Sequence, residues 1–442
     1  MGNDSCDHCR GNGSATKDAL SPEKICMDWR QRQRAGAGLH NLGNTCFLNT
    51  VLQCLTYTPP LANYLLSREH SRSCRLQGFC MMCIMEAHVN KVLHSSARAI
   101  RPTAVVSVLT REHFQLGMQE DAHEFLRYTV DAMQRACLSG GSDWHISSQA
   151  TTIVHQIFGG FLRSRVTCSS CKAVSDTYEP FLDISLDIRA ASSVTGALED
   201  LVTPEQLDSE NGYKCSKCER LATASTRLTI YHPSNVLTVC LKRVDPFSGR
   251  KISKFVQYPE YLDLGAYMSQ AAGEPLVYSL YAVAVHQGSS CHEGHFYCFV
   301  KASDGRWYKM NDASVGVCDI KTVLRQRAYL LFYARHHDLT PGAGAEYQAT
   351  KSTSVAKPGR VPKSPFSRGS VGLSNQEGGE NMHWIQGKRQ TWGSAGTPPQ
   401  HCGRKRACSD TEEGEKLNGS QPDCPPPKRR CTGRTETQKR TH

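Results

Sequence analysis

The amino-acid sequence predicts an α+β fold in which a helical half is followed by a half made mainly of strands. Between about residues 46 and 137, apolar side chains recur every three or four positions, which is the spacing of an amphipathic helix. From about residue 153, apolar and polar side chains alternate instead, most plainly in the segment FLDISLDI at 181–188. Helices that are followed by a run of strands are typical of the α+β class.

Two helices are predicted most clearly in the first half of the chain. One begins near Cys46 and continues to about residue 55, and the other covers at least 125–133. In 181–188 the apolar side chains at even positions are expected to point one way and the polar ones between them the other. Further strands are expected at 236–243, 279–286, 295–301, 306–310 and 328–334.

The chain has 442 residues, of which 39% are hydrophobic, enough for one large core or two ordinary domains. We expect a flexible lead-in at 1–34, a folded domain at 35–335 and a disordered basic tail at 336–442. Net charge is +11, and residues 351–442 contain 17 Lys and Arg against 8 Asp and Glu, so most of the surplus belongs to the tail. That tail is rich in Gly, Ser, Pro, Thr and Gln, which favours disorder.

The sequence favours a soluble intracellular protein. Its first residues form no apolar run of the signal-peptide type, and no stretch has the length of a transmembrane helix. In a reducing compartment, the 21 cysteines are better explained as metal ligands, a catalytic thiol and buried apolar residues than as disulfides.

The segment GLHNLGNTCFLNTVLQCL at 38–55 is a Gly- and Asn-rich turn that leads directly into a helix. Asn44 or Thr45 is a natural N-cap, which places Cys46 in the first helical turn. Free backbone N–H groups and the helix dipole there are expected to lower the pKa of the Cys46 thiol. The same N–H groups and the Asn41 amide could hold an oxyanion. The alternative is a capped helix with a buried cysteine.

A cysteine nucleophile requires a base, and the segment 285–315 contains His286, His292 and His295. We favour His295, because it begins a strand directly after a glycine and can be fixed by the sheet while facing a cleft. If the turn at 303–305 has three residues, Asn311 lies on the same sheet face as His295. Its carbonyl could then accept the His295 Nδ1–H and leave Nε2 to take the thiol proton. The alternative is an ordinary hairpin.

Together, these segments resemble the ubiquitin-specific proteases. The match lies in GLHNLGNTCFLN around Cys46, QEDAHEFL around Asp121 and GHFYCFVK…WYKMNDASV around His295. LQCLTYTPPLANYLLSREHS and VDAMQRAC are similar to the small cytokine-inducible deubiquitinase subfamily. The resemblance covers about 300 residues and implies a papain-like cysteine protease fold with thumb, palm and fingers. It also implies roles in proliferation and apoptosis.

The resemblance implies a catalytic triad of Cys46, His295 and Asn311, with Asp312 in a supporting role and no catalytic cofactor. Many members have Asp where this chain has Asn311, which keeps the hydrogen-bond acceptor but lacks the negative charge. A catalytically weak or inactive ubiquitin-binding scaffold is therefore the alternative to an active ubiquitinyl hydrolase. In the family, acidic residues at the positions of Asp121 and Glu124 hold the two arginines of the ubiquitin tail; the alternative is a solvated helix face.

Two cysteine pairs predict a structural zinc site. Cys168 and Cys171 form one pair, Cys215 and Cys218 form the other, and each has two residues between its cysteines. Four protein thiolates around zinc leave no open position, so the site would be structural. The resemblance implies that this zinc fixes the tips of the finger strands that grip ubiquitin.

A second group of potential zinc ligands has irregular spacing, and buried cysteines on helices are the alternative there. Its members are His70, Cys74, Cys80, Cys83 and His88.

The tail contains two short basic runs, 404–406 and 428–430, which are typical of nuclear import sequences. Basic disordered segments also bind nucleic acids or other polyanions weakly, so a zinc- and tail-dependent nucleic-acid binder is a further alternative. Ubiquitin and ubiquitinated proteins are the expected partners. A nuclear location is expected, with the cytoplasm or the endoplasmic-reticulum surface as other locations.

Overall fold

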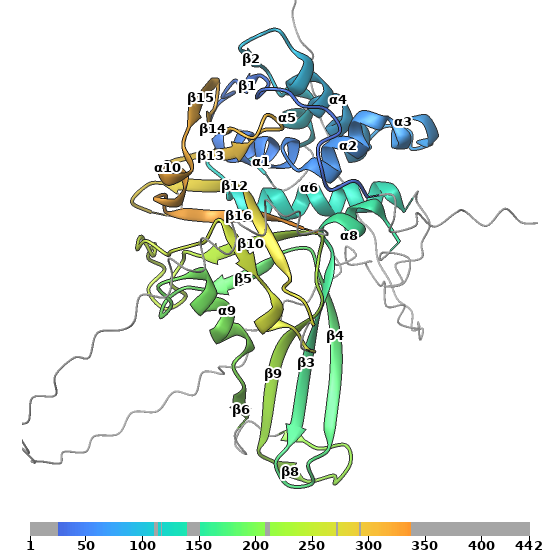
Figure 1. The fold of residues 1–442 in the computed structure, drawn as a ribbon, viewed down its shortest axis with the longest axis vertical. Coiled ribbons are helices and arrows are strands. Elements are labelled where there is room, and N and C mark those ends of the chain that lie inside the picture. The colour runs from blue at the N-terminus through green and yellow to red at the C-terminus, as the bar shows by residue number, and fades with distance from the viewer. Residues whose placement is uncertain are drawn as a thin grey trace, which may run out of the picture. The chain divides into compact units, whose positions relative to one another are not determined.

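The computed structural model describes residues 25–109, 114–115, 117–138, 151–207, 213–270, 273–290 and 293–336. In this part of the chain the longer helices come first and strands dominate after residue 160, so the predicted α+β class is confirmed (Figure 1). No helix within these ranges combines the length and the apolar character that crossing a membrane would require.

The helical part is built around α1 (Cys46–Thr56), whose 11 residues are all buried. It packs against α6, an amphipathic helix that begins with an Asp side-chain cap, and against the strand that begins at His295. Pro59 and Pro60 begin the next helix, where their fixed φ angles suit the first turn. The other helices of this part are α2 (Pro59–Ser67), α3 (Glu69–Ser73), α4 (Met81–His94), α5 (Thr103–Leu109), α6 (Ala122–Cys137) and α8 (Ile153–Phe158).

The central sheet has eight strands in the order β15-β14-β13-β12-β16-β10-β5, and β11 also pairs with β12. All neighbours are antiparallel except β10 and β5. One apolar core lies between this sheet and the helices around α1, and a second one covers the sheet with α9 (Val194–Val202). Its strands are β5 (Ile184–Asp187), β10 (Val236–Lys242), β11 (Tyr261–Asp263), β12 (Val277–Gln287), β13 (His295–Lys301), β14 (Trp307–Asn311), β15 (Ser314–Cys318) and β16 (Ala328–Arg335).

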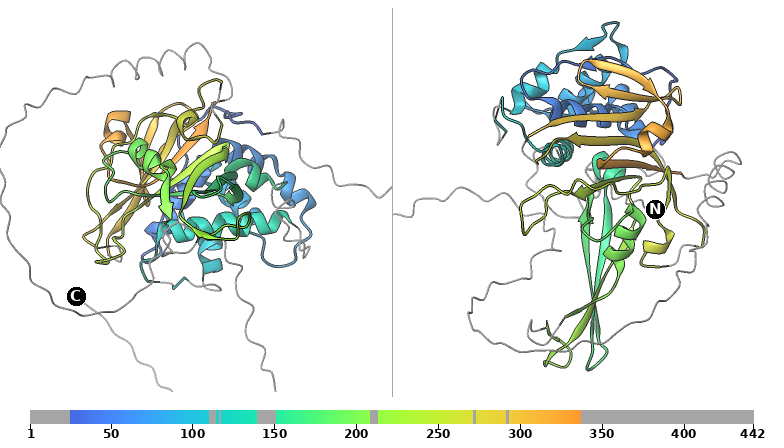
Figure 2. Two further views of the ribbon diagram at one scale, coloured as in Figure 1. Left: turned by 90° about the horizontal axis from the view of Figure 1, so that it is seen from below. Right: turned by 90° about the vertical axis from the view of Figure 1, so that its left-hand side faces the viewer.

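A second sheet, here called the finger sheet, has the order β4-β3-β9-β6 and extends away from the helices (Figures 1 and 2). The two-stranded sheet of β7 and β8 belongs to its tip, whereas β1 and β2 pair in parallel beside α1. The strands are β1 (Gly38–Leu39), β2 (Ala99–Ile100), β3 (Gly160–Cys168), β4 (Val174–Phe181), β6 (Glu205–Leu207), β7 (Tyr213–Lys214), β8 (Leu221–Ala222) and β9 (Ala224–His232). Two short helices, η3 (Gly265–Tyr267) and α10 (Ile320–Leu324), complete the description.

Two sequence expectations are refined by the packing. In 181–188 the four alternating aliphatic side chains are buried as predicted, but Asp183 is buried too, because it pairs with His123 of α6 at 2.8 Å. Residues 25–34, which the sequence placed in a flexible lead-in, are held against the domain. The Arg30 N–H donates to Asn63 Oδ1 at 3.3 Å, and the Gln33 N–H donates to Ser303 Oγ at 2.7 Å.

Candidate active site

The turn before α1 is closed by the side chain of Asn41. Asn41 Oδ1 accepts hydrogen bonds from the N–H groups of Gly43 and Thr45, both at 3.1 Å. Gly43 and Asn44 have φ angles of 101° and 54°, a left-handed conformation that Gly and Asn adopt most readily. Thr45 is the N-cap, and Cys46 is therefore the first residue of the helix.

His295 is the first residue of β13 and follows a glycine that no other residue could replace without strain. Gly294 has φ +146°, and a Cβ there would lie 2.3 Å from the carbonyl oxygen of Gln287. Gly288 is equally restricted, because a Cβ would lie 2.0 Å from the oxygen of Glu293. The two glycines let the end of β12 approach the residues just before β13, where His295 begins the strand.

Asn311 orients His295 through a hydrogen bond of 2.6 Å between its Oδ1 and His295 Nε2. The turn between the two strands has three residues with Gly305 at φ +82°, and the register that pairs Cys298 with Met310 places Asn311 beside the start of β13. The sequence expectation that Nδ1 would bind Asn311 is wrong. The structure uses Nε2, so Nδ1 is the nitrogen left for the thiol proton.

His286 is held in a different arrangement from His295. Its Nδ1 lies 3.0 Å from Lys251 Nζ, and its ring stacks on Phe296 at 4.3 Å between centroids. Burial and the Lys251 charge lower the pKa of His286 to about 4. His286 is therefore neutral at physiological pH, with one nitrogen occupied. His292 lies outside the described residues.

Cys46 lies against the beginning of β13, where the Phe296 backbone N–H donates a hydrogen bond to its thiol. The residue is 3% exposed. The expectation of a lowered pKa is wrong. Burial raises the pKa of Cys46, the negative charge of Asp312 raises it further, and the N–H donors only partly offset these effects.

Asp312 links the turn before α1 to the turn between β14 and β15. Its carboxylate accepts hydrogen bonds from Asn41 Nδ2 at 3.0 Å and from Asn49 Nδ2 at 2.8 Å. Its backbone oxygen accepts the Leu39 N–H at 2.8 Å. This close approach requires Gly38, since a Cβ there would lie 2.5 Å from the oxygen of Ala313. Asn41 thus has one amide hydrogen committed to Asp312, and its second hydrogen remains for an oxyanion.

The two acidic residues near the start of α6 have different surroundings. Asp121 is the N-cap and directly precedes the first helical residue, whereas Glu124 lies in the first turn of α6. Asp121 Oδ1 accepts the N–H groups of His123 and Glu124, and its Oδ2 accepts the Tyr329 hydroxyl at 2.7 Å. Glu124 is exposed at the beginning of the helix. Glu124 is therefore the freer of the two to bind a cationic partner.

Gln119 is a site residue that the sequence analysis missed. Its Oε1 accepts the Gly294 N–H at 2.8 Å, and its Nε2 donates to the Gly294 oxygen at 2.9 Å. One side chain thereby holds both polar groups of the residue before His295. The position of Gln119 two residues before Asp121 in QEDAHEFL was the only available indication.

The four cysteines of the predicted metal site meet at the tip of the finger sheet. One sulfur from each lies within 4.8 Å of all the others, and the Sγ atoms of Cys171 and Cys215 are 3.6 Å apart. Lys172 and Glu219 each follow the second cysteine of a pair and have φ angles of 60° and 55°. Both pairs thus form the same tight turn, one at the end of β3 and the other directly after β7.

The basic runs at 404–406 and 428–430, and with them the tail predicted at 336–442, lie outside the described residues except for His336. The same holds for residues 1–24 of the predicted lead-in.

Known proteins match most of the described part of this chain. The family model described as ubiquitin carboxyl-terminal hydrolase matches residues 37–333. Ubiquitin carboxyl-terminal hydrolase 42 of Homo sapiens is 58% identical over 340 residues, which are 76% of this chain and 26% of that protein. Ubiquitin carboxyl-terminal hydrolase 17-like protein 15 of Homo sapiens is 50% identical over 327 residues, 74% of this chain and 58% of that protein. The chain thus spans about a quarter and somewhat over half of these two relatives.

A solved structure has the same fold. It is a chain from the SAGA Ubp8/Sgf11/Sus1/Sgf73 DUB module bound to ubiquitin aldehyde, with a TM-score of 0.61 and 30% sequence identity. The similarity covers 68% of this chain and 70% of that one.

Proposed function

This chain belongs to the ubiquitin carboxyl-terminal hydrolase family, and from that premise we propose that it is a thiol-dependent deubiquitinase. It cleaves the isopeptide or peptide bond that follows the C-terminal glycine of ubiquitin. The observation that carries the proposal is the placement of Cys46 at the start of α1 against β13, with His295 at the head of β13 and held by Asn311 at 2.6 Å.

In the first step, His295 Nδ1 takes the proton of the Cys46 thiol, and the sulfur attacks the carbonyl carbon of the ubiquitin C-terminal glycine. Because burial and Asp312 raise the pKa of Cys46, the thiol is protonated in the resting enzyme and needs this base. Asn311 holds the ring through Nε2, which keeps the hydrogen on that nitrogen and leaves Nδ1 as the acceptor.

The tetrahedral intermediate then develops negative charge on the former carbonyl oxygen. The second amide hydrogen of Asn41 and the N–H groups at the start of α1 are its donors. Asp312 keeps the Asn41 amide in one orientation through the bond of 3.0 Å. Collapse breaks the C–N bond, His295 gives its proton to the leaving amine, and a thioester to Cys46 remains. Water, deprotonated by His295, hydrolyses this thioester and restores the thiol.

The ubiquitin tail is basic near its end, and the exposed carboxylate of Glu124 is the primary partner that we propose for it. Asp121 is less available to the substrate, because its carboxylate oxygens already accept hydrogen bonds from Tyr329 and from the N–H groups at the start of α6. The family resemblance implies a narrow channel next to Cys46 that admits only glycines at the end of the substrate, because larger side chains would clash there.

We further propose that Cys168, Cys171, Cys215 and Cys218 hold a structural zinc ion at the finger tip. Four sulfurs within 4.8 Å of one another suit tetrahedral coordination. Backbone N–H groups of Cys171 and Cys218 donate to Cys168 and Cys215, which stabilises thiolate ligands. When bound, zinc joins the two turns and keeps the finger sheet ready for ubiquitin, which is also bound in the related module.

The proposal extends to ubiquitinated proteins as substrates and to a nuclear location, supported by the basic runs at 404–406 and 428–430. We also propose that the same tail binds nucleic acids or other polyanions weakly. The cytoplasm and the endoplasmic-reticulum surface are the other proposed locations. Roles in proliferation and apoptosis are proposed on the family resemblance alone.

The competing proposal is an inactive ubiquitin-binding scaffold, because Asn311 lacks the negative charge of Asp. The bond of 2.6 Å between Asn311 and His295 favours an active enzyme, since the ring is already held in a productive tautomer.

The test is covalent labelling by ubiquitin that carries a C-terminal electrophile, together with hydrolysis of a ubiquitin amide. We expect the wild-type chain to be labelled and to cleave, and Cys46→Ser to do neither. Cys54→Ser, a change of a buried cysteine further along α1, is the matched control and should keep both activities. Labelling without cleavage would support the scaffold, and neither reaction in the wild-type chain would overturn the proposal.

A further inference from the structure

We propose that His70, Cys74, Cys80 and Cys83 form a second zinc site, which is separate from the finger tip and built into the helical part. One ligand atom from each of these residues lies within 4.8 Å of all the others. Among the residues that the structure describes, only this group and the finger-tip cysteines meet that condition. The spacing of these residues in the sequence is irregular because they belong to two helices and to the caps of those helices.

The ligands are placed by the ends of α3 and α4. His70 lies in α3, Cys74 is its C-cap, Cys80 is the N-cap of α4, and Cys83 lies in the first turn of that helix. His70 Nε2 is 3.1 Å from Cys80 Sγ. Tetrahedral zinc with sulfur at about 2.3 Å and nitrogen at about 2.0 Å holds its ligand atoms about 3.5 to 4 Å apart. The four atoms therefore need only small movements to bind the ion.

The two clusters also share a feature of the backbone around their sulfurs. The Leu76 N–H donates to the Cys74 sulfur, and the Cys83 N–H donates to the Cys80 sulfur. At the finger tip, Cys168 and Cys215 receive N–H donors in the same way from residues two or three positions later. Such N–H donors stabilise the thiolate form that a metal ligand requires.

Little apolar burial stabilises the loop between α3 and α4. α3 has five residues, and the loop from 74 to 80 has Leu76 and Phe79 exposed by 37% and 38%. An ion bound by both ends of this loop would supply the stability that apolar burial does not. His88, the fifth candidate from the sequence, lies outside the group of ligand atoms and is buried.

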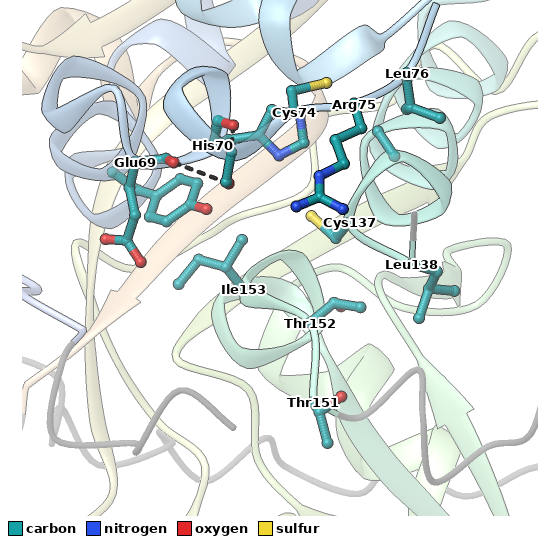
Figure 3. Close-up of a pocket in the computed structure, with 13 residues that line it drawn as sticks. Glu69, His70, Cys74, Arg75, Leu76, Cys137, Leu138, Thr151, Thr152 and Ile153 are labelled. Carbon is teal, nitrogen blue, oxygen red and sulfur yellow. Dashed lines mark hydrogen bonds between the residues drawn. The ribbon is translucent and has the colours of Figure 1, made fainter. Parts of the chain in front are cut away.

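A pocket next to the four proposed ligands is lined by Arg75, which carries a positive charge, and by Cys137, which serves as a control. Figure 3 shows His70, Cys74 and Arg75 along one side of this pocket, with Cys137 and Thr152 along the other. Three thiolates and a neutral imidazole around Zn²⁺ leave one net negative charge, and Arg75 is the cation at hand to offset it. Cys137 lines the same pocket but is not among the four ligand residues.

The proposed ion would be structural, because four protein ligands leave no open position for a substrate. Its site is at the first turn of α4, and the last turns of the same helix support the chain before Cys46. There the Ala37 N–H donates to the Val92 oxygen at 2.9 Å, and a Cβ at Gly36 would lie 2.1 Å from that oxygen. The ion thus fixes one end of a helix whose other end positions the entry to the catalytic turn.

The first experiment measures zinc per full-length chain by elemental analysis and native mass spectrometry. We expect the double change Cys80→Ser with Cys83→Ser to lose about one zinc ion per chain relative to wild type. Cys137→Ser, the matched control from the same pocket, should lose none. Cys215→Ser with Cys218→Ser should lose a different zinc ion, so that all four changes together lose about two. Zinc content that is unchanged by the first double change would overturn the proposal.

The second experiment uses the wild-type chain and does not depend on a variant that folds. N-ethylmaleimide labelling is followed at each cysteine by mass spectrometry, with and without a zinc chelator. Cys74, Cys83 and Cys318 are all half-buried. We expect Cys74 and Cys83 to be protected until the chelator is added, whereas Cys318 reacts equally in both conditions. Equal labelling of all three without chelator, or a disulfide between two of the proposed ligands, would contradict a zinc site.

Discussion

Cys46 at the start of α1 and Cys215 at the finger tip are 3% and 1% exposed, yet their thiols are in opposite electrostatic surroundings. Burial and Asp312 raise the pKa of Cys46. The backbone N–H groups of Cys218 and Lys217 lower the pKa of Cys215 to about 6. A metal ligand must remain a thiolate, whereas a nucleophile needs to lose its proton only when substrate and base are present. The comparison teaches that two cysteines of similar solvent exposure can differ in reactivity: desolvation and Asp312 dominate at Cys46, whereas backbone N–H donors dominate at Cys215.

Removal of the proposed general base, His295, should have the largest effect on catalysis. Because the pKa of Cys46 is raised, the thiol depends on His295, and His295→Ala should reduce kcat by about a thousandfold. The measurement is hydrolysis of a ubiquitin amide near neutral pH. His94→Ala, a change of an exposed histidine, should leave the rate unaltered. A His295→Ala enzyme with substantial activity would mean that Cys46 is deprotonated without a base.

Asn311→Ala should have the next largest effect, a fall in kcat of about a hundredfold with little change in KM, because the imidazole loses its orienting acceptor. Asn311→Asp keeps the acceptor and adds a charge that favours the imidazolium, so its kcat should equal or exceed that of the wild type. Steady-state kinetics on a ubiquitin amide measure both. Equal losses in both variants would show that Asn311 acts by packing and not by this hydrogen bond.

A change of the finger-tip cysteine Cys215 should act mainly on the binding of the ubiquitin substrate. Cys215→Ser removes a thiolate from the finger tip, and we expect KM to rise by about tenfold or more while kcat falls less. Kinetics and a thermal melt of the same sample measure the effect. Lys217→Ala, which alters a side chain of the same turn and keeps the backbone donor, is the control. A larger effect on kcat than on KM would contradict the separation of the two sites.

Gln119→Ala should lower kcat by roughly three- to tenfold, because Gly294 loses two hydrogen bonds and His295 becomes less well positioned. Gln119→Glu retains the acceptor for the Gly294 N–H and should be intermediate. Full pH–rate profiles distinguish positioning from a general loss of stability, which a thermal melt reports. Gln115→Ala, a change of an exposed residue nearby, should behave as wild type.

The smallest effect concerns pH. With the pKa of Cys46 raised, its labelling by iodoacetamide should speed up as pH rises through the alkaline range, because the thiolate fraction grows. Asp312→Asn removes the negative charge that opposes the thiolate, so the midpoint of this curve should move to lower pH. Labelling rates are read by intact mass. An unchanged midpoint would mean that burial alone sets the pKa of Cys46.

Several features of the site followed from residues that are close in the sequence. The helix start at Cys46 depends on a turn of five residues from Asn41 to Thr45. The register of β13 and β14 depends on a turn of three residues ending in Gly305, and each finger-tip turn depends on one cysteine pair. These features are local, because short-range hydrogen bonds and left-handed positions are encoded by a few neighbouring residue types.

Only the tertiary structure decided how these parts act together. It showed which His295 nitrogen binds Asn311, that Gln119 holds Gly294, and that Cys46 has a raised and not a lowered pKa. It also brought His70 next to Cys80, ten positions away, through the packing of α3 against α4. Burial and the distances between side chains of different elements arise from packing of the whole domain, and no window of the sequence contains them.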